Sequence, residues 1–443
     1  MPLERSVSLY QAVIYGIGVI LGAGIYALIG VAAGISGNAL WISFIIAALI
    51  AGLTALSYAE LGARFPREAA EAFFVRKAFG SRPFAFFVGF IAFFTLTVSA
   101  TAVAWGFASY FKLFTNLSPL IVAIGIVLIC SAVNFRGIQE SVRLNNIFTL
   151  IEAFGLLLII AFGIPFLGSV DLFTGISGET GLALVPALFS SAALIFFAFL
   201  GFEEIPNIAE EIRNPRKNVP LAIILSLSIA TILYILVAMM SVSVVSPMEL
   251  ANAANTSASL TEGPLALVAE KSIGPGFGFW LTIIALFATF NTVLVLLITA
   301  SRFLYGLSKQ DMLPLFLSKI HPKTKTPYFA IMVVLVLGVL LAAAGNLEVL
   351  GNMTTMGTFL MFFAVNAALI KVRLSEKTGG TPFSGLKRIP WLAVLGAAFC
   401  AYMFSTQFWF PATIMGVTLP LIVFGLGIFA LSIPIYWFFS IRR

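Results

Sequence analysis

Twelve long runs of apolar residues constrain the fold of this chain more than any other feature. A membrane-spanning helix needs about 20 mostly apolar residues, because lipid offers no partners to its backbone polar groups. The 443-residue chain is 60% hydrophobic and only 10% charged, far more apolar than a water-soluble protein of this length. We therefore predict an all-α polytopic membrane protein with a single transmembrane domain over residues 1–443. The predicted helices cover approximately residues 8–34, 38–63, 84–111, 119–135, 145–167, 184–209, 219–245, 277–306, 328–345, 350–371, 390–411 and 414–440.

The basic residues are distributed unevenly between the two sides of the predicted helices. The net charge is +7, and with the N-terminus inside, all lysines and arginines except Lys112 and Lys271 fall in inward-facing segments. Positive residues collect in cytoplasmic loops, so we predict that both termini are cytoplasmic and that these loops contact anionic membrane lipid. The basic charge then needs no nucleic-acid partner. The N-terminal stretch MPLERSVSLY lacks the features of a cleavable signal, and we expect the plasma membrane as the location.

Residues that carry enzymatic or metal chemistry are sparse. Cys130 and Cys400 lie inside predicted helices without the spacing of a metal or redox motif, and the single histidine, His321, lies in a basic loop. The sequence contains no nucleophile–histidine pair and no cluster of metal ligands. We therefore expect no enzyme activity, no catalytic residues, no metal site and no cofactor.

Two of the predicted helices contain residues that interrupt a helix. The first run contains Gly22-Ala23-Gly24 at mid-span, and the sixth contains Gly201-Phe202-Glu203-Glu204-Ile205-Pro206. Glycine also serves close helix packing in membranes, which is the alternative interpretation. A matched pair of interrupted helices, five helices apart, is typical of inverted-repeat transporters. We predict repeats over 8–167 and 184–374, with the last two helices, 389–440, outside them.

Three stretches predicted to face the cytoplasm carry a family likeness. GLTALSYAELGARFP (52–66), FAFLGFEEIPNIAEEIRNPRKNVPLA (197–222) and ASRFLYGLSKQDMLPLFLSKIHPKTKTP (300–327) resemble permeases of the amino acid–polyamine–organocation superfamily, as does GAGI in the first helix. The likeness covers nearly the whole chain. It implies the LeuT-like fold of five plus five helices, and secondary transport of amino acids or polyamines by alternating access. The chain departs from the family after Pro66, where REAAEAFF replaces Gly-Gly and a tyrosine.

The break in the first helix provides a site for a carboxylate. The N-terminal end of the outer half-helix offers free backbone N–H groups and the positive end of a helix dipole. Ala23, Gly24 and Ile25 are placed to donate these groups to the carboxylate of an amino acid. A small residue such as Gly22 allows the close approach that a side chain would block.

The second break completes the predicted binding site. The resemblance implies that carbonyls near Phe197 and Leu200, with that of Ile20, accept hydrogen bonds from the substrate ammonium. In relatives an aromatic residue just before this break covers the substrate, and Phe197 matches it, with simple packing as the alternative. Trp105, Asn291 and Thr292 are expected around the substrate side chain. The predicted substrate-binding residues are Ile20, Gly22, Ala23, Gly24, Ile25, Phe197, Leu200, Gly201, Phe202 and Asn291.

Glu152 stands in the otherwise apolar run NNIFTLIEAFGLLLII (145–160). It lies seven residues after Asn145, or about 10 Å into the helix. A charged acid near the bilayer centre costs about 2.5–3.5 kcal/mol, so such a residue turns toward the protein interior. Burial favours the neutral acid, which makes Glu152 a candidate proton carrier.

The resemblance places Glu152 near the position where sodium-driven relatives bind their ion. Several relatives have a lysine there in place of the ion, so a lysine mechanism does not transfer to this chain. Sodium sites of this fold use two adjacent hydroxyl residues, which the eighth run, ALFATFNTVLV, lacks. We therefore prefer a proton over sodium. A neutral glutamic acid bonded to a carbonyl of the first helix, without a coupling role, is the remaining alternative.

Glu203 is the second predicted coupling residue. It matches an acidic position common in the family, and we expect it to face the cytoplasmic pathway, with a structural hydrogen bond as the alternative. Together these features predict a proton-coupled secondary transporter of neutral or broad-range L-amino acids. A cationic amino acid or polyamine exchanger is the first alternative. A membrane sensor or channel that binds an amino acid without active transport is the second.

Overall fold

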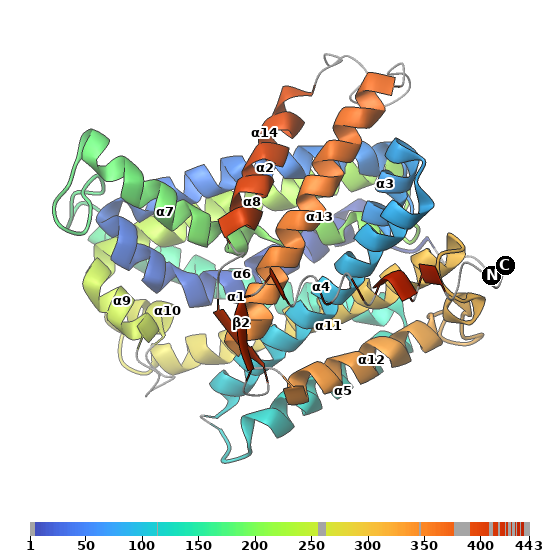
Figure 1. Ribbon diagram of the computed structural model, residues 1–443. Helices are drawn as coiled ribbons and strands as arrows, with labels where there is room; N and C mark the ends of the chain where they lie inside the picture. Colours follow the sequence, from blue (N-terminus) through green and yellow to red (C-terminus); the bar gives the residue numbers. More distant parts are fainter. Residues whose placement is uncertain are drawn as a thin grey trace.

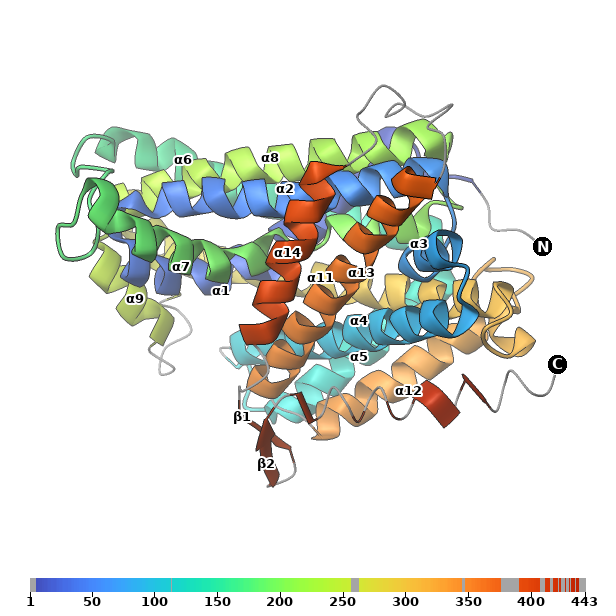
Figure 2. The same cartoon turned by 45° about the horizontal axis from the view of Figure 1, so that its top comes forward.

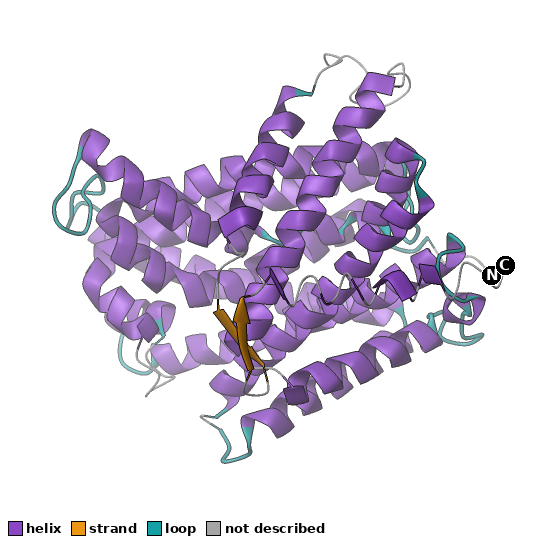
Figure 3. Ribbon diagram, viewed as in Figure 1, coloured by secondary structure: helices purple, strands orange, loops and turns teal. Residues whose placement is uncertain are grey.

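The computed structural model describes residues 5–112, 114–255, 263–344, 347–375 and 390–406, and parts of 411–437. These residues are nearly all helical, as Figure 3 shows. The helices are α1 (Leu9–Ser36), α2 (Leu40–Arg64), α3 (Ala70–Phe79), α4 (Arg82–Phe111), α5 (Pro119–Arg136), α6 (Ile138–Gly163), α7 (Val185–Ile195), α8 (Pro215–Val244), α9 (Pro247–Asn255), α10 (Pro264–Ser272), α11 (Phe277–Lys309), α12 (Tyr328–Ala344), α13 (Leu347–Ser375) and α14 (Trp391–Thr406).

Nine helices in the described part of the chain are long and apolar enough to cross a membrane. They correspond to the first eight predicted helices and the tenth. The ninth and eleventh predicted helices appear as α12 and α14, which are apolar but shorter. The predicted membrane-spanning, all-helical architecture is therefore confirmed in outline, and the total of twelve spans stays a prediction.

The prediction of a helix from residue 414 is wrong at its start. Residues Pro411–Ile414 (β1) and Val417–Pro420 (β2) pair as a short antiparallel hairpin, shown in orange in Figure 3. Half of the residues in each strand are β-branched and favour an extended backbone, and Pro420 has no N–H for a helical hydrogen bond. Most of the remaining predicted helix, up to residue 440, lies outside the described residues.

The long helices form two packed groups. In the first, α2 and α8 lie side by side (Figures 1 and 2) and both contact α1, while α7 packs against α1 and α2. In the second, α4 packs against α5, α11 and α12. Helix α6 contacts α1, α8 and α11 and so bridges the groups, whereas α13 and α14 run obliquely across the others (Figure 2). The junction between the groups holds the candidate site.

Both predicted helix breaks are present at this junction. Helix α1 loses its helical geometry at Gly22, where φ is −15° and ψ is −151°. Helix α7 ends at Ile195 and continues as separate 3-10 turns, η4 (Phe196–Phe199), η5 (Phe202–Glu204) and η6 (Pro206–Ile208). Between the first two turns, Leu200 is extended and Gly201 has a φ of 128°, which side-chain-bearing residues rarely adopt.

Candidate functional site

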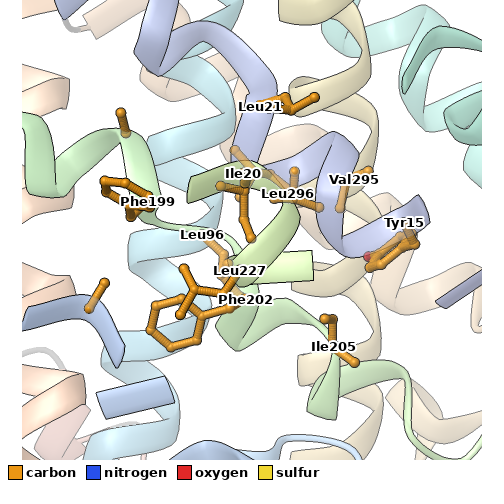
Figure 4. Close-up of a cluster of buried hydrophobic side chains, with 14 of the residues drawn as sticks. Tyr15, Ile20, Leu21, Leu96, Phe199, Phe202, Ile205, Leu227, Val295 and Leu296 are labelled. Atoms are coloured by element: carbon orange, nitrogen blue, oxygen red, sulfur yellow. The ribbon is translucent and has the colours of Figure 1, made fainter. Parts of the chain in front are cut away.

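The two breaks lie against each other. Figure 4 shows Ile20 of α1 close to the segment that carries Phe199 and Phe202. A Cβ atom added to Gly24 would lie 2.7 Å from the Cα of Ala198, and one added to Gly201 would lie 2.7 Å from Cγ1 of Val19. Glycine is therefore required on both sides for the unwound backbones to meet.

A tyrosine of α8 links the two breaks. The buried Tyr234 hydroxyl lies 2.5 Å from the carbonyl oxygen of Ile20 and 3.1 Å from that of Ala198. Its single hydroxyl proton is shared between these two carbonyl oxygens. The sequence analysis missed Tyr234. The one available signal is a polar hydroxyl in the apolar run SLSIATILYILVAMM.

A cavity lies beside the breaks, between α1, α4, α11, α13 and the unwound part of α7. The predicted substrate-binding residues on its wall are Ile20, Gly24, Phe197, Leu200 and Gly201. The predicted coupling residue Glu203 and the predicted pocket residue Thr292 also line it. The sequence analysis missed the wall formed by α4 and α13. That wall adds hydroxyl groups from Thr95, Ser99, Thr354 and Thr358.

Three of the threonines around the cavity use their hydroxyl protons within their own helices. Thr292 donates to the carbonyl of Ala288 at 3.0 Å, Thr354 to that of Leu350 at 2.9 Å, and Thr358 to that of Thr354 at 2.9 Å. Such back-bonding satisfies the hydroxyl donor inside the helix. The oxygens keep lone pairs that can accept hydrogen bonds in the cavity.

Other predicted site residues lie off the cavity wall. Gly22 is covered by Thr292, since a Cβ added to Gly22 would lie 2.3 Å from the Oγ1 of Thr292. Ile25 and Phe202 are fully buried in the apolar core, and the backbone of Ala23 is helical directly after the break. Asn291 and Trp105 do not line the cavity.

A second cavity adjoins the first. It lies between α1, α7, α13 and α14, and both cavities are lined by Phe197, Leu200 and Thr358. These three side chains therefore separate the two spaces. Phe197 thus lies between the two cavities, and its predicted role as a gate stays a prediction.

Glu152 is fully buried and belongs to a polar cluster between α6 and α11, behind α1. The Nδ2 of Asn291 lies 3.4 Å from Oε1 of Glu152 and 3.3 Å from the hydroxyl of Thr149. Gly18 of α1 covers this cluster so tightly that an added Cβ would lie 1.9 Å from Thr149 Oγ1. Among the residues that the structure describes, Oε2 of Glu152 and the side-chain oxygens of Asn145 and Asn291 have no hydrogen-bond partner. Glu152 thus points into the protein but does not line the central cavity.

Glu203 stabilises the unwound segment on the cavity wall. Its Oε2 accepts a 2.7 Å hydrogen bond from the backbone N–H of Gly201, and the side chain is 5% exposed. A carboxylate at this position satisfies a donor that the break leaves free. The side chain thus bonds to its own segment rather than to a neighbouring helix.

The end of the molecule that carries the basic loops is closed beneath the cavity. Arg302 is fully buried, with Nη1 2.6 Å from Oδ1 of Asn134 and Nη2 3.6 Å from Oε1 of Glu211. Nearer the surface, Lys309 pairs with Glu210 at 2.8 Å. We call this end the basic face. Among the described residues, no group of three or more His, Cys, Asp or Glu side chains could hold a metal ion.

These features define an integral membrane protein whose central cavity is bounded by two broken helices. The amino acid permease family model matches residues 7–431, and the chain belongs to that family. It is 30% identical to the branched-chain amino acid permease BcaP of Bacillus subtilis, over 92% of this chain and 89% of that protein. It is 29% identical to the methylthioribose transporter of B. subtilis, over 94% and 90% of the two chains. It is also 29% identical to mouse cationic amino acid transporter 4, over 84% of this chain and 60% of the mouse protein.

Proposed function

We propose that this permease is a secondary active transporter that moves neutral L-amino acids across the plasma membrane by alternating access. The paired breaks beside one cavity are the observation that carries the proposal. Gly24 and Gly201 bring unwound backbone to the cavity wall, where a desolvated carboxylate and ammonium need partners. The largely apolar wall suits an uncharged side chain, and a similar chain is named a branched-chain amino acid permease.

The substrate would be held mainly by backbone groups. Backbone N–H groups of Ala23, Gly24 and Ile25 follow the α1 break and would donate to the carboxylate. Carbonyls near Phe197 and Leu200 would accept from the ammonium. The carbonyl of Ile20 already accepts from Tyr234 and has a second lone pair for the substrate.

The arrangement of helices supports the five-plus-five repeat. One packed group contains the first two spans of each predicted repeat, α1 and α2 with α7 and α8. The other contains the third and fourth spans, α4 and α5 with α11 and α12. This pairing is what two inverted repeats would produce. Both termini would lie on the cytoplasmic side, with the basic face.

We propose that a proton on Glu152 drives the transport. A buried carboxyl without a cation is most stable when neutral, and the pair with Asn291 is compatible with a protonated acid. Sodium is the competing ion, because Glu152, Asn145 and Asn291 together offer three buried oxygens that have no hydrogen-bond partner among the described residues. Sodium prefers such oxygen ligands, so the experiment must vary both ions.

Uptake into proteoliposomes of the purified full-length chain tests the proposal. Radiolabelled leucine, alanine and arginine are compared, with an inward proton gradient or an inward sodium gradient imposed. We expect the proton gradient to drive accumulation of a neutral amino acid, and Glu152→Gln to equilibrate it without accumulation. Glu140→Gln is the matched control, because Glu140 is exposed and lies on the same helix.

The alternatives give different results in the same assay. Accumulation driven by sodium alone would assign Glu152 to a sodium site. Preferential exchange of arginine would favour the cationic transporter, an activity named for the mouse relative. Saturable binding without accumulation or counterflow would indicate a sensor or channel and would reject transport.

A further inference from the structure

Helix α3 and the residues before it contain the stretch REAAEAFF (67–74), which the proposed transport mechanism does not use. Figure 2 shows α3 beside the ends of α2 and α4, and it also packs against α13. Its first N–H, from Ala70, donates to Oδ1 of Asn207 at 2.9 Å. Helix α3 thus joins the α4 side of the molecule directly to the unwound segment that follows Gly201.

This stretch places a carboxyl group, Glu71, inside the closed basic face. The side chain is 1% exposed. Its Oε1 accepts from the Tyr58 hydroxyl at 3.0 Å and from Nδ2 of Asn207 at 3.4 Å, whereas Oε2 has no hydrogen-bond partner in the described part of the chain. No ion pair involves Glu71 within the described ranges of the chain.

The groups around Glu71 add negative rather than positive charge. Tyr58 reaches it from α2, and Glu203 and Glu204 interact with it electrostatically from η5. Basic side chains on α3 and the neighbouring elements are engaged elsewhere: Arg76 with Gln310, Lys77 with the Phe73 ring, Arg82 with Asp311, Arg302 with Glu211 and Arg373 with Glu60.

The buried charges at this face do not balance. Five glutamates here are each at most 5% exposed: Glu68, Glu71, Glu203, Glu204 and Glu211. In the described structure, the buried cation that pairs with one of them is Arg302, which lies beside Glu211. Unpaired buried carboxylates are strongly destabilised, so such groups take up protons instead. Burial raises the pKa of the Glu71 carboxyl to about 7, and burial also raises the pKa of Glu68 and of Glu211.

We propose that Glu71 is a proton-binding residue of the inner gate, which holds a proton while the basic face is closed and releases it when that face opens. The inference rests on the alternating access proposed above, and it adds a proton site separate from Glu152. Deprotonation would leave a charge beside Glu203 without a counter-ion. Separation of α3 from Asn207 would expose that charge to water and relieve the repulsion.

The sign of the pH effect follows directly. Below about pH 7, Glu71 is neutral and the closed arrangement is stable. Above that pH, the charged form favours the open arrangement, and one released proton shifts the ratio of open to closed by up to about tenfold per pH unit.

Spin-label distance measurements on the full-length chain in lipid nanodiscs test the proposal. Labels are attached to Lys77→Cys on α3 and Lys217→Cys at the start of α8, both exposed positions. The only native cysteines, Cys130 and Cys400, are 0% and 1% exposed and should not be labelled. Without substrate, we expect a short distance at pH 6 and a growing longer population at pH 8. In Glu71→Gln the short distance should persist at both pH values.

Two further variants separate a proton site from a merely structural residue. Tyr58→Phe removes a hydrogen-bond donor that stabilises the charged form of Glu71. The midpoint of the pH-dependent distance change should therefore move to higher pH, while the distance still responds to pH. Glu140→Gln, an exposed acid outside the cluster, should behave as wild type. An unchanged pH response in Glu71→Gln refutes the proposal. So does closure at pH 8 when sodium replaces N-methyl-D-glucamine, since that would assign the site to a metal cation.

The transport assay keeps the two proposals distinct. If the distance shifts with pH through Glu71 but no amino acid accumulates, the gate assignment stands and the transport proposal fails. If accumulation is normal while the distance ignores pH in wild type, transport stands and the gate assignment fails.

Discussion

Replacing Gly201 by alanine tests the contact between the two breaks most directly. Gly201 has a φ of 128°, and holding a side-chain-bearing residue in such a region costs about 1–3 kcal/mol. The new Cβ would lie 2.7 Å from Cγ1, 2.9 Å from Cβ and 3.0 Å from the backbone carbon of Val19. Overpacking of this kind adds about 1–3 kcal/mol. We expect a total destabilisation of about 2–6 kcal/mol, unless α1 moves away from the unwound segment.

Thermal unfolding and substrate binding together report both outcomes. The apparent melting temperature of Gly201→Ala in detergent should fall by at least about 3 °C, and movement of α1 should weaken binding of a radiolabelled neutral amino acid. Gly52→Ala is the control, because a Cβ on Gly52 of α2 meets nothing within 4 Å and alanine favours a helix. If Gly201→Ala melts and binds like wild type, the proposed close contact between the breaks is wrong.

Two further substitutions probe neighbouring contacts. Tyr234→Phe leaves the carbonyls of Ile20 and Ala198 without their shared donor, so we expect a loss of about 1–3 kcal/mol of stability, seen as a lower melting temperature, with Tyr436→Phe as the control. Arg302→Ala leaves Glu211 buried without its cation, which should cost about 3–5 kcal/mol at neutral pH. Acidification that neutralises Glu211 should recover part of that loss. A pH-independent melting temperature for Arg302→Ala would contradict this assignment.

The membrane-spanning helices could be predicted because lipid leaves the sequence few choices. Long apolar runs favour membrane-spanning helices, and the predicted positions agree within a few residues with α1, α2, α4, α5, α8 and α11. The breaks were also predictable, since Gly22 and Gly201 relax the backbone locally. The pairing of Pro411–Ile414 with Val417–Pro420 was not predicted, because apolarity alone does not distinguish a strand from a helix.

The sequence predicted those residues of the candidate site whose position depends on a single segment of the chain. Gly24, Phe197 and Gly201 lie on the cavity wall because they belong to the breaks themselves. Tyr234 and the hydroxyls of α4 and α13 were missed, because their role depends on helix rotation in the packed bundle. Asn291 was assigned to the substrate pocket, but its side chain faces Glu152 on α6. Apolar periodicity is too weak in these buried helices to fix which residue faces which neighbour.

The back-bonded threonines of the cavity have a consequence for charge selection. Thr292, Thr354 and Thr358 present oxygen lone pairs rather than protons to the cavity, and Glu203 and Glu204 share its wall. A substrate side chain that donates hydrogen bonds can satisfy these oxygens. The side-chain carboxylate of glutamate or aspartate would lose its hydration and meet further acceptors. If the cavity binds the substrate as proposed, we expect it to accept neutral amino acids and to exclude acidic ones through this unfavourable electrostatic environment.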